Sequence, residues 1–122
     1  MNSSLYRQVI LNHYKHPQNK RWMPDATQMV EHKNANCGDH LKLFLKIDAG
    51  VVTDVSFVGE GCALSVAGAS LLTGHIQNMP IEDVRKLTPD TVFTLLGTTV
   101  TPGRLHCALL SFEALGKALS MV

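Results

Sequence analysis

Two neighbouring segments in the middle of the chain alternate apolar and polar side chains, which is typical of strands with one buried face. The apolar positions are Leu41, Leu43, Leu45 and Ile47 in the first segment and Val51, Thr53, Val55 and Phe57 in the second. Asp48-Ala49-Gly50 separates the segments and suits a short hairpin loop, because glycine readily adopts the left-handed backbone that such loops need. A weaker strand is expected over residues 27–32, so the pattern predicts a three-stranded antiparallel sheet.

Apolar residues at helical spacing flank this predicted sheet. A first helix is expected from Ser3 or Ser4 to about Lys15, and Pro17 ends it because proline disfavours helical backbone at the preceding residue. Further helices are expected over residues 62–78, 80–86, 88–97 and 102–120. The order helix, strands, helices predicts an α+β domain with its helices packed on one face of a single sheet.

Two of these helices carry apolar stripes that should face the core. The stripes are Leu64, Gly68, Leu71, Leu72 and Ile76 on the helix after Cys62, and Ala108, Phe112, Leu115 and Leu119 on the last helix. Between the first helix and the sheet, residues 18–26 are expected to form an irregular connection. Its Trp22 either contacts a partner protein or covers the edge of the core.

Composition is that of a globular protein. The 122 residues are 45% hydrophobic and 17% charged, and the net charge is +1. Residues 1–122 are therefore expected to form one domain, and charge makes no case for a nucleic-acid partner. The sequence has no run of about 18 apolar residues, and Arg7 and Gln8 interrupt the start of any apolar signal segment. We expect a cytoplasmic protein without a membrane partner.

Three cysteines, Cys37, Cys62 and Cys107, stand in three separate segments of the chain. In a reducing compartment, widely spaced cysteines are more often metal ligands, reactive thiols or inert buried residues than disulfides. No two of them have the CxxC spacing of zinc ribbons and redox motifs. Cys62 and Cys107 fall at the starts of predicted helices, where the helix dipole favours the thiolate that a metal ligand or a nucleophile requires. The pattern favours metal binding or thiol chemistry.

Asp39 stands two residues after Cys37, and the glycine between them lets both side chains turn toward one centre. Oxygen binds soft metals less firmly than thiolate does, so three thiolates with Asp39 would suit a metal or cluster that must leave again. Two alternatives are open. Asp39 is a turn residue in the first, and His106 is the fourth ligand or a base beside Cys107 in the second. Arg104 is a candidate to neutralise an anionic site.

Several motifs stand in a recognisable order along nearly the whole chain. The first are Leu5-Tyr6-Arg7-Gln8-Val9-Ile10, His13-Tyr14-Lys15 and Pro17-Gln18-Asn19, and the later ones are Cys37-Gly38-Asp39, Gly59-Glu60-Gly61-Cys62-Ala63-Leu64-Ser65 and Arg104-Leu105-His106-Cys107. Together they resemble the iron–sulfur cluster assembly scaffolds of the IscU/NifU N-terminal family, and most closely its SufU branch. The residue at position 104, arginine, resembles the SufU branch, and the residue at position 106, histidine, resembles the IscU branch.

The resemblance implies an α+β fold of the SufE/NifU type. It also implies a site formed by Cys37, Asp39, Cys62 and Cys107, which in the family holds Zn²⁺, or iron as an assembling [2Fe-2S] cluster. Such a protein is a scaffold more than an enzyme. A cysteine desulfurase delivers sulfur to a site cysteine, with Cys37 and Cys107 as candidate acceptors, and apo iron–sulfur proteins receive the cluster. Arg104 and His106 would lie next to the ligands without binding the metal themselves.

Two other functions are compatible with the same residues. One is a zinc-dependent sulfur acceptor, a sulfurtransferase of the SufU type that passes persulfide sulfur onward without forming a cluster. The other is a zinc-stabilised interaction domain, in which the metal contributes on the order of 10 kcal/mol toward folding.

Overall fold

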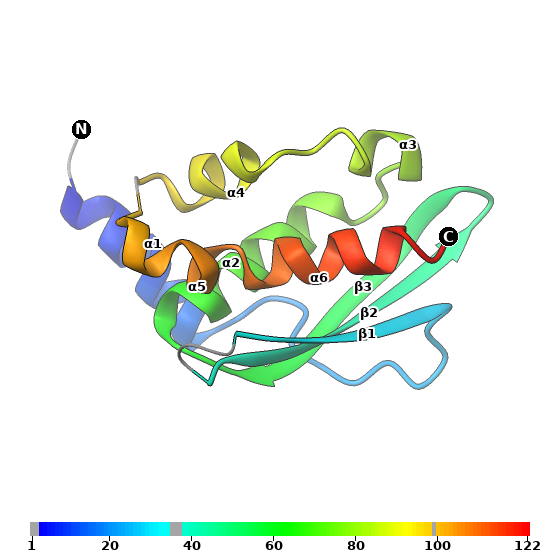
Figure 1. The fold of residues 1–122 in the computed structure, drawn as a ribbon, viewed down its shortest axis with the longest axis horizontal. Helices are drawn as coiled ribbons and strands as arrows, with labels where there is room; N and C mark the ends of the chain where they lie inside the picture. The colour runs from blue at the N-terminus through cyan, green and yellow to red at the C-terminus, as the bar shows by residue number, and fades with distance from the viewer. Residues whose placement is uncertain (1–2, 35–37, 99) are drawn as a thin grey trace.

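The computed structural model describes residues 3–34, 38–98 and 100–122, and it shows a twisted sheet beside a layer of helices (Figure 1). The strands are β1 (Gln28–Lys33), β2 (His40–Asp48) and β3 (Val51–Glu60). The helices are α1 (Ser3–Lys15), α2 (Ala63–Ile76), α3 (Ile81–Val84), α4 (Pro89–Leu96), the 3-10 turn η1 (Pro102–Arg104), α5 (Leu105–Ala108) and α6 (Leu110–Leu119). The strands pair antiparallel in the order β1-β2-β3, and α2 and α6 pack on the sheet. The predicted α+β fold is confirmed.

The loop between β2 and β3 has the expected hairpin geometry. Asp48 pairs with Val51, so Ala49 and Gly50 alone form the loop, and their φ angles are 51° and 77°. Two consecutive left-handed residues make a type I′ turn, whose twist matches that of the flanking strands. The glycine stands where it was expected, and the strand pairing on both sides holds Ala49 in the less favourable conformation.

One residue of β3 interrupts the predicted alternation. Ile47 pairs with Val52 and Lys46 pairs with Asp54, so Thr53 is an extra residue opposite β2, which is a β-bulge. Val52 is fully buried and Thr53 is exposed. The sequence-based assignment of Thr53 to the core face is therefore wrong. The buried face of β3 starts again at Val55, beyond the bulge.

Helix α2 lies at the centre of the helical layer, in contact with α1, α4, α6 and β3. It is buried on most of its circumference rather than along one stripe, because neighbours surround it. Leu64 and Leu71 are half-buried, and both pack against the smaller core cluster as predicted; the cluster consists of Ala67, Val92, Leu96 and Ala108. At Gly68, a member of the predicted stripe, a Cβ atom would lie 2.9 Å from the carbonyl oxygen of Ala108. The glycine lets α2 approach α5 closely.

The predicted last helix, residues 102–120, is three pieces. The backbone leaves helical geometry at Arg104 (φ −116°, ψ 5°) and at Leu109 (φ −96°, ψ 5°), which separates η1, α5 and α6. Ala108, Leu115 and Leu119 are buried as predicted, whereas Phe112 is half-buried. The short helix α5 is thus a separate element, and it carries Cys107.

The face of the sheet opposite α2 and α6 is partly covered by the connection that follows α1. The ring of Trp22 lies 5.4 Å from the ring of Phe44, centroid to centroid, and the amino group of Lys42 lies 5.2 Å from the Trp22 ring centroid. Phe44 is only 4% exposed, but Trp22 is 62% exposed. Trp22 covers Phe44 with one face and presents the other to solvent.

Within the described part of the chain, none of the helices has both the length and the apolar character needed to cross a bilayer.

Candidate metal centre

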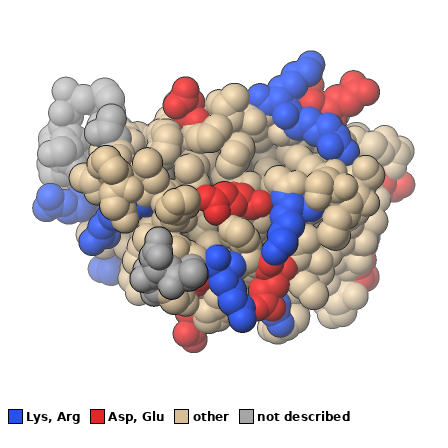
Figure 2. All heavy atoms as spheres, in the orientation of Figure 1, with Lys and Arg blue, Asp and Glu red and all other residues tan. Residues whose placement is uncertain are grey.

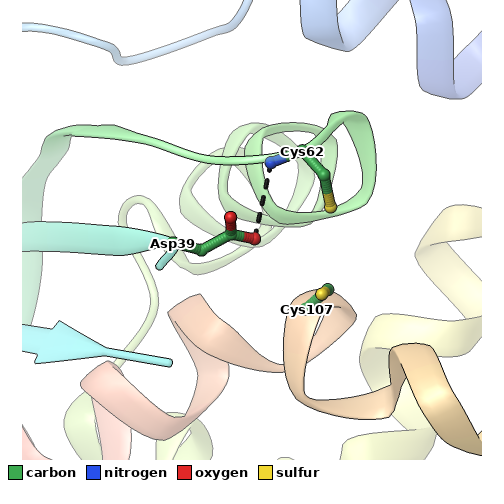
Figure 3. Close-up of side chains that lie close together, drawn as sticks. All are labelled: Asp39, Cys62 and Cys107. Atoms are coloured by element: carbon green, nitrogen blue, oxygen red, sulfur yellow. Dashed lines mark hydrogen bonds between the residues drawn. The ribbon is translucent and has the colours of Figure 1, made fainter. Parts of the chain in front are cut away.

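Three predicted ligands from distant segments meet at one end of the sheet. Asp39 precedes β2, Cys62 immediately precedes α2, and Cys107 lies in α5. The candidate ligand atoms of these residues all lie within 4.8 Å of one another. Figure 3 shows the Cys62 side chain directed toward Cys107, with the Asp39 carboxylate beside them. Cys37, the fourth predicted ligand, lies outside the described residues.

The backbone before β2 presents Asp39 to this centre. The Asn34 amide donates to the Asp39 carbonyl oxygen at 2.8 Å, and the Gly38 amide donates to the Asn34 carbonyl oxygen at 3.0 Å. Gly38 has a φ of 74°, a left-handed conformation that a glycine adopts without strain. Asp39 is only 7% exposed.

Donors on and before α2 hold the Asp39 carboxylate. The Ser65 hydroxyl donates to Asp39 Oδ2 at 2.5 Å, and the Cys62 amide donates to the same oxygen at 3.4 Å. Both donors belong to the N-terminal end of α2, where backbone N–H groups lack partners within the helix and favour negative charge. The carboxylate is thus buried with hydrogen-bond donors, as a buried charge requires.

Each described cysteine also has a polar neighbour. Cys62 is the N-cap residue of α2, and its sulfur lies 3.5 Å from Ser65 Oγ. Cys107 exposes 9% of its surface, and the Asn34 side-chain amide donates to its sulfur at 3.8 Å. Neither cysteine forms a disulfide. Both thiols are thus oriented toward one point.

The donor set fits a thiophilic metal. Four ligands around Zn²⁺ sit at about 2.0–2.3 Å from the ion, which places them about 3.5–4 Å from one another. The spacing of the three described ligand atoms, at most 4.8 Å, requires a contraction of about 1 Å to reach such a geometry. Two thiolates suit zinc or iron, and the carboxylate is the weaker ligand.

The two residues expected beside the ligands, Arg104 and His106, are both exposed. His106 is exposed, and its Nδ1 lies 3.2 Å from Glu113 Oε1, while His32 Nε2 lies 2.8 Å from Glu113 Oε2. Among the described residues, the group of ligand atoms within 4.8 Å does not include His106. Arg104 is exposed and, with Arg7, lines an open groove of about 340 Å³. The idea of His106 as fourth ligand stays untested.

Sequence reasoning missed three residues at or beside this centre. Ser65 and Asn34 contact the ligands, and Glu113 joins His106 to β1. Ser65 had a signal, because it follows Cys62 by three residues and so lies in the first turn of the same helix. Asn34 had none, since its contact with Cys107 spans 73 residues of sequence. Glu113 stands seven residues after His106, but its contact with His32 spans 81 residues.

Comparisons with known proteins add independent findings. The family described as NifU-like N terminal domain matches residues 5–122. The zinc-dependent sulfurtransferase SufU of Bacillus subtilis is 37% identical, over 96% of this chain and 90% of its own. The iron–sulfur cluster assembly scaffold protein IscU of Thermotoga maritima is 30% identical, over 97% of this chain and 94% of its own. In fold, a candidate scaffold for the SUF system from Fervidobacterium islandicum matches with a TM-score of 0.82 at 23% identity, covering 98% and 99% of the two chains.

Proposed function

The chain belongs to the NifU-like N-terminal domain family, and on this premise we propose that it is an iron–sulfur cluster assembly scaffold. It would receive sulfur from a cysteine desulfurase, build a [2Fe-2S] cluster and transfer the cluster to apo-proteins. The observation that carries the proposal is the convergence of Asp39, Cys62 and Cys107 from three segments. The name of the Thermotoga maritima relative supports the same role. Reduced thiols are needed, so we propose the cytoplasm as its compartment.

We propose Cys37, Asp39, Cys62 and Cys107 as the ligands of the assembling cluster or of Zn²⁺. The bound metal would supply Lewis acidity and hold the thiols as thiolates. The protein contributes the arrangement: α2 and α5 bring two sulfur atoms together, and the turn before β2 adds a carboxylate. Because three thiolates bind iron more firmly than Asp39 does, the carboxylate is the ligand that an acceptor protein would displace first.

Sulfur delivery would occur by thiol–persulfide exchange. The thiolate of Cys37 or Cys107 attacks the outer sulfur of the donor persulfide, a new S–S bond forms, and the donor cysteine leaves as a thiolate. Cys107 exposes 9% of its surface, so a donor needs an approach between the surrounding segments. The groove lined by Arg7, Ala63 and Arg104 adjoins both helix starts and presents two guanidinium groups that favour an anionic persulfide.

Anaerobic reconstitution tests the proposal. Wild-type protein is incubated with ferrous iron, cysteine and a cysteine desulfurase, and we expect the visible absorption of a [2Fe-2S] cluster followed by its transfer to an apo-ferredoxin. Cys62→Ser and Cys107→Ser should lose both signals, while Asp48→Ala, an exposed aspartate at the far end of β2, should behave as wild type. A wild type that forms no cluster, or a Cys62→Ser variant that forms as much, would contradict the proposal.

A second candidate function is zinc-dependent sulfur transfer without a cluster. The Bacillus subtilis relative, which is named for this activity, favours it, as does the fit of the donor set to zinc. Desulfurase turnover is measured with zinc-loaded and metal-free protein. If sulfur transfer depends on zinc, only the zinc-loaded protein should stimulate desulfurase turnover. Equal stimulation by the zinc-loaded and metal-free forms excludes this function.

A further inference from the structure

Ser65 connects two of the proposed metal ligands. It lies in the first turn of α2 and is 3% exposed. Its hydroxyl donates to Asp39 Oδ2 at 2.5 Å, and the hydroxyl oxygen itself, Ser65 Oγ, lies 3.5 Å from Cys62 Sγ. A buried hydroxyl thus stands between the carboxylate and one of the thiols of the centre, without being a ligand of the usual type itself.

The direction of this hydrogen bond follows from the groups involved. A hydroxyl has a single hydrogen, and an ionised carboxylate can only accept, so the hydrogen of Ser65 points to Asp39. A charge-assisted bond of this kind is short and about twice as strong as a neutral one. With the Cys62 amide as second donor to the same oxygen, the carboxylate is restrained from two sides.

Close packing around Gly61 leaves this pair little room to move. A Cβ atom on Gly61 would lie 2.9 Å from the Ser65 Cβ and 3.1 Å from the Asp39 Cγ. Real Cβ atoms do not approach other carbon atoms to 2.9 Å, so the site needs a glycine at this position. Asp39 and Ser65 are therefore held together by a hydrogen bond and by the backbone that passes beside them.

We propose that Ser65 is a positioning residue of the metal centre. Its hydroxyl holds the Asp39 carboxylate in the orientation in which it binds the metal, and Ser65 thereby sets how firmly the centre retains a metal ion. This inference rests on the metal site of the proposed function, and it concerns metal retention rather than sulfur or cluster chemistry. Hydrogen-bond partners of metal ligands commonly contribute 10–100-fold to metal affinity.

The first measurement is the zinc affinity of Ser65→Ala, by competition with a chromophoric chelator. We expect the affinity to fall by about 10–100-fold relative to wild type. Cobalt(II) replaces zinc in a parallel experiment, because its visible bands report the ligands and their geometry. The bands of the variant should change in position or intensity, which a change in folding stability alone would not cause.

Two further variants show whether Ser65 acts through Asp39. Ser111→Ala removes another buried serine hydroxyl, from α6, and should keep wild-type affinity and cobalt bands. In an Asp39→Ala background, Ser65→Ala should have no further effect, because the residue that it positions is absent. If Ser65→Ala lowers zinc affinity in the Asp39→Ala background as much as it does in the wild type, the proposal is overturned. It is also overturned if Ser65→Ala alone has the zinc affinity and cobalt spectrum of the wild type.

Gly61→Ala gives an independent test if Ser65→Ala does not fold. Its Cβ would displace the Ser65–Asp39 pair, so metal affinity should fall although the hydroxyl is retained. Folding is checked by circular dichroism without metal, and unchanged affinity in a folded Gly61→Ala variant contradicts the inference. A protein that binds zinc with this dependence on Ser65 but forms no cluster and accepts no sulfur would reject the proposed function and leave this inference standing.

Discussion

At the scale of single residues, Asp39 is the proposed ligand that would distinguish this centre from a site of four thiolates. It is buried, it accepts hydrogen bonds from Ser65 and from the Cys62 amide, and it lies beside two sulfur atoms. Oxygen is a harder ligand than thiolate and binds zinc or iron in such a site less firmly. In the proposed ligand set, Asp39 is therefore the ligand suited to dissociate while the thiolates remain bound.

Replacing Asp39 with a cysteine should make the centre hold a metal ion or a cluster more firmly. Asp39→Cys is expected to bind zinc more tightly than wild type and to transfer a reconstituted cluster to apo-ferredoxin more slowly, because thiolate is the softer ligand. Transfer is followed by the absorbance of the acceptor over time. Asp48→Cys, the matched change at an exposed aspartate, should transfer at the wild-type rate, and transfer by Asp39→Cys at that same rate would refute a role for the carboxylate in release.

How far the sequence predicts single residues depends on how local their signals are. Asp39, Cys62 and Cys107 were singled out because their residue types and their places beside glycines or helix starts are visible in the sequence. Asn34 was not, because its bond to the Cys107 sulfur exists only after β1 and α5 are brought together. Contacts of this kind depend on tertiary packing, and they cannot be predicted from residue type and local spacing alone.

At the scale of elements, the approach of α2 to α5 determines where Cys107 stands. Gly68 on α2 faces the carbonyl oxygen of Ala108, the residue after Cys107. The backbone irregularities at Arg104 and Leu109 make α5 a separate turn, which contacts α2 as well as its two neighbours in the chain. The distance between the two cysteines is thus tied to the absence of a side chain at position 68.

Gly68→Ala should weaken both the fold and the metal centre. A Cβ atom 2.9 Å from a backbone oxygen forces α5 away from α2, and overpacking of this kind costs about 1–3 kcal/mol of unfolding free energy. Chemical denaturation measures the loss, and chelator competition should show reduced zinc affinity in the folded variant. Gly116→Ala is the control, since a Cβ there meets no neighbouring atom within 4 Å. Equal stability of the two variants would contradict the role of Gly68.

Periodicity predicted the elements well where their backbone is regular. The strands and the helices α1 and α4 lie close to their expected bounds. The bulge at Thr53 and the break at Leu109 were missed. A single inserted residue, or a single residue with non-helical backbone angles, does not visibly change the apolar pattern of the sequence around it. The buried surface of α2 is broader than the predicted stripe, because neighbours on several sides pack against this central helix.

The connection between α1 and β1 is joined to the sheet by charged side chains. Lys46 donates to Asp25 at 2.7 Å, and Arg21 pairs with Asp54 at 2.6 Å. The hydrogen bond from Lys46 lowers the pKa of Asp25 below its ordinary value of 3.8. Both carboxylates lie on the surface, so each pair contributes little to stability on its own.

This pKa shift predicts the direction of a pH effect. Because the pKa of Asp25 is lower in the folded state, the stabilising contribution of its carboxylate is present above the unfolded-state pKa and disappears as the pH falls through the folded-state value. The difference in unfolding free energy between wild type and Asp25→Asn should thus be constant above about pH 5 and should shrink below about pH 4. Thermal unfolding at a series of pH values measures it, and a difference that grows on acidification would contradict the assignment.

At the scale of the whole molecule, the metal centre and the hydrophobic core are largely separate. The main core lies between the sheet and helices α2 and α6 and includes Leu43, Val55, Phe57, Leu72 and Leu115. The three candidate ligands, Asp39, Cys62 and Cys107, are not members of this cluster. The fold therefore has its own source of stability, and metal binding adds to it.

Metal removal should lower stability without unfolding the protein. Zinc at 100 times its dissociation constant adds about 2.7 kcal/mol, and chelation removes that amount. We expect metal-free protein to keep its circular dichroism spectrum at 25 °C and to melt at a lower temperature than the zinc form. If chelation instead unfolds the domain at 25 °C, the metal is structural, and a zinc-stabilised interaction domain becomes the better interpretation.

Trp22 has a practical consequence for all of these measurements. It is the only tryptophan in the sequence, it is 62% exposed, and it shares a surface hollow with His40 and Glu60, which stand next to Asp39 and Gly61 in the chain. In Figure 2, charged side chains of both signs are spread over the face shown, so charge alone marks no single contact area there. The intrinsic fluorescence of Trp22 should therefore serve as an unlabelled optical reporter, shifting to shorter wavelength when a partner covers this side of the sheet. Titration with a desulfurase or an acceptor could then be followed in the ultraviolet, apart from the visible bands of any bound cluster.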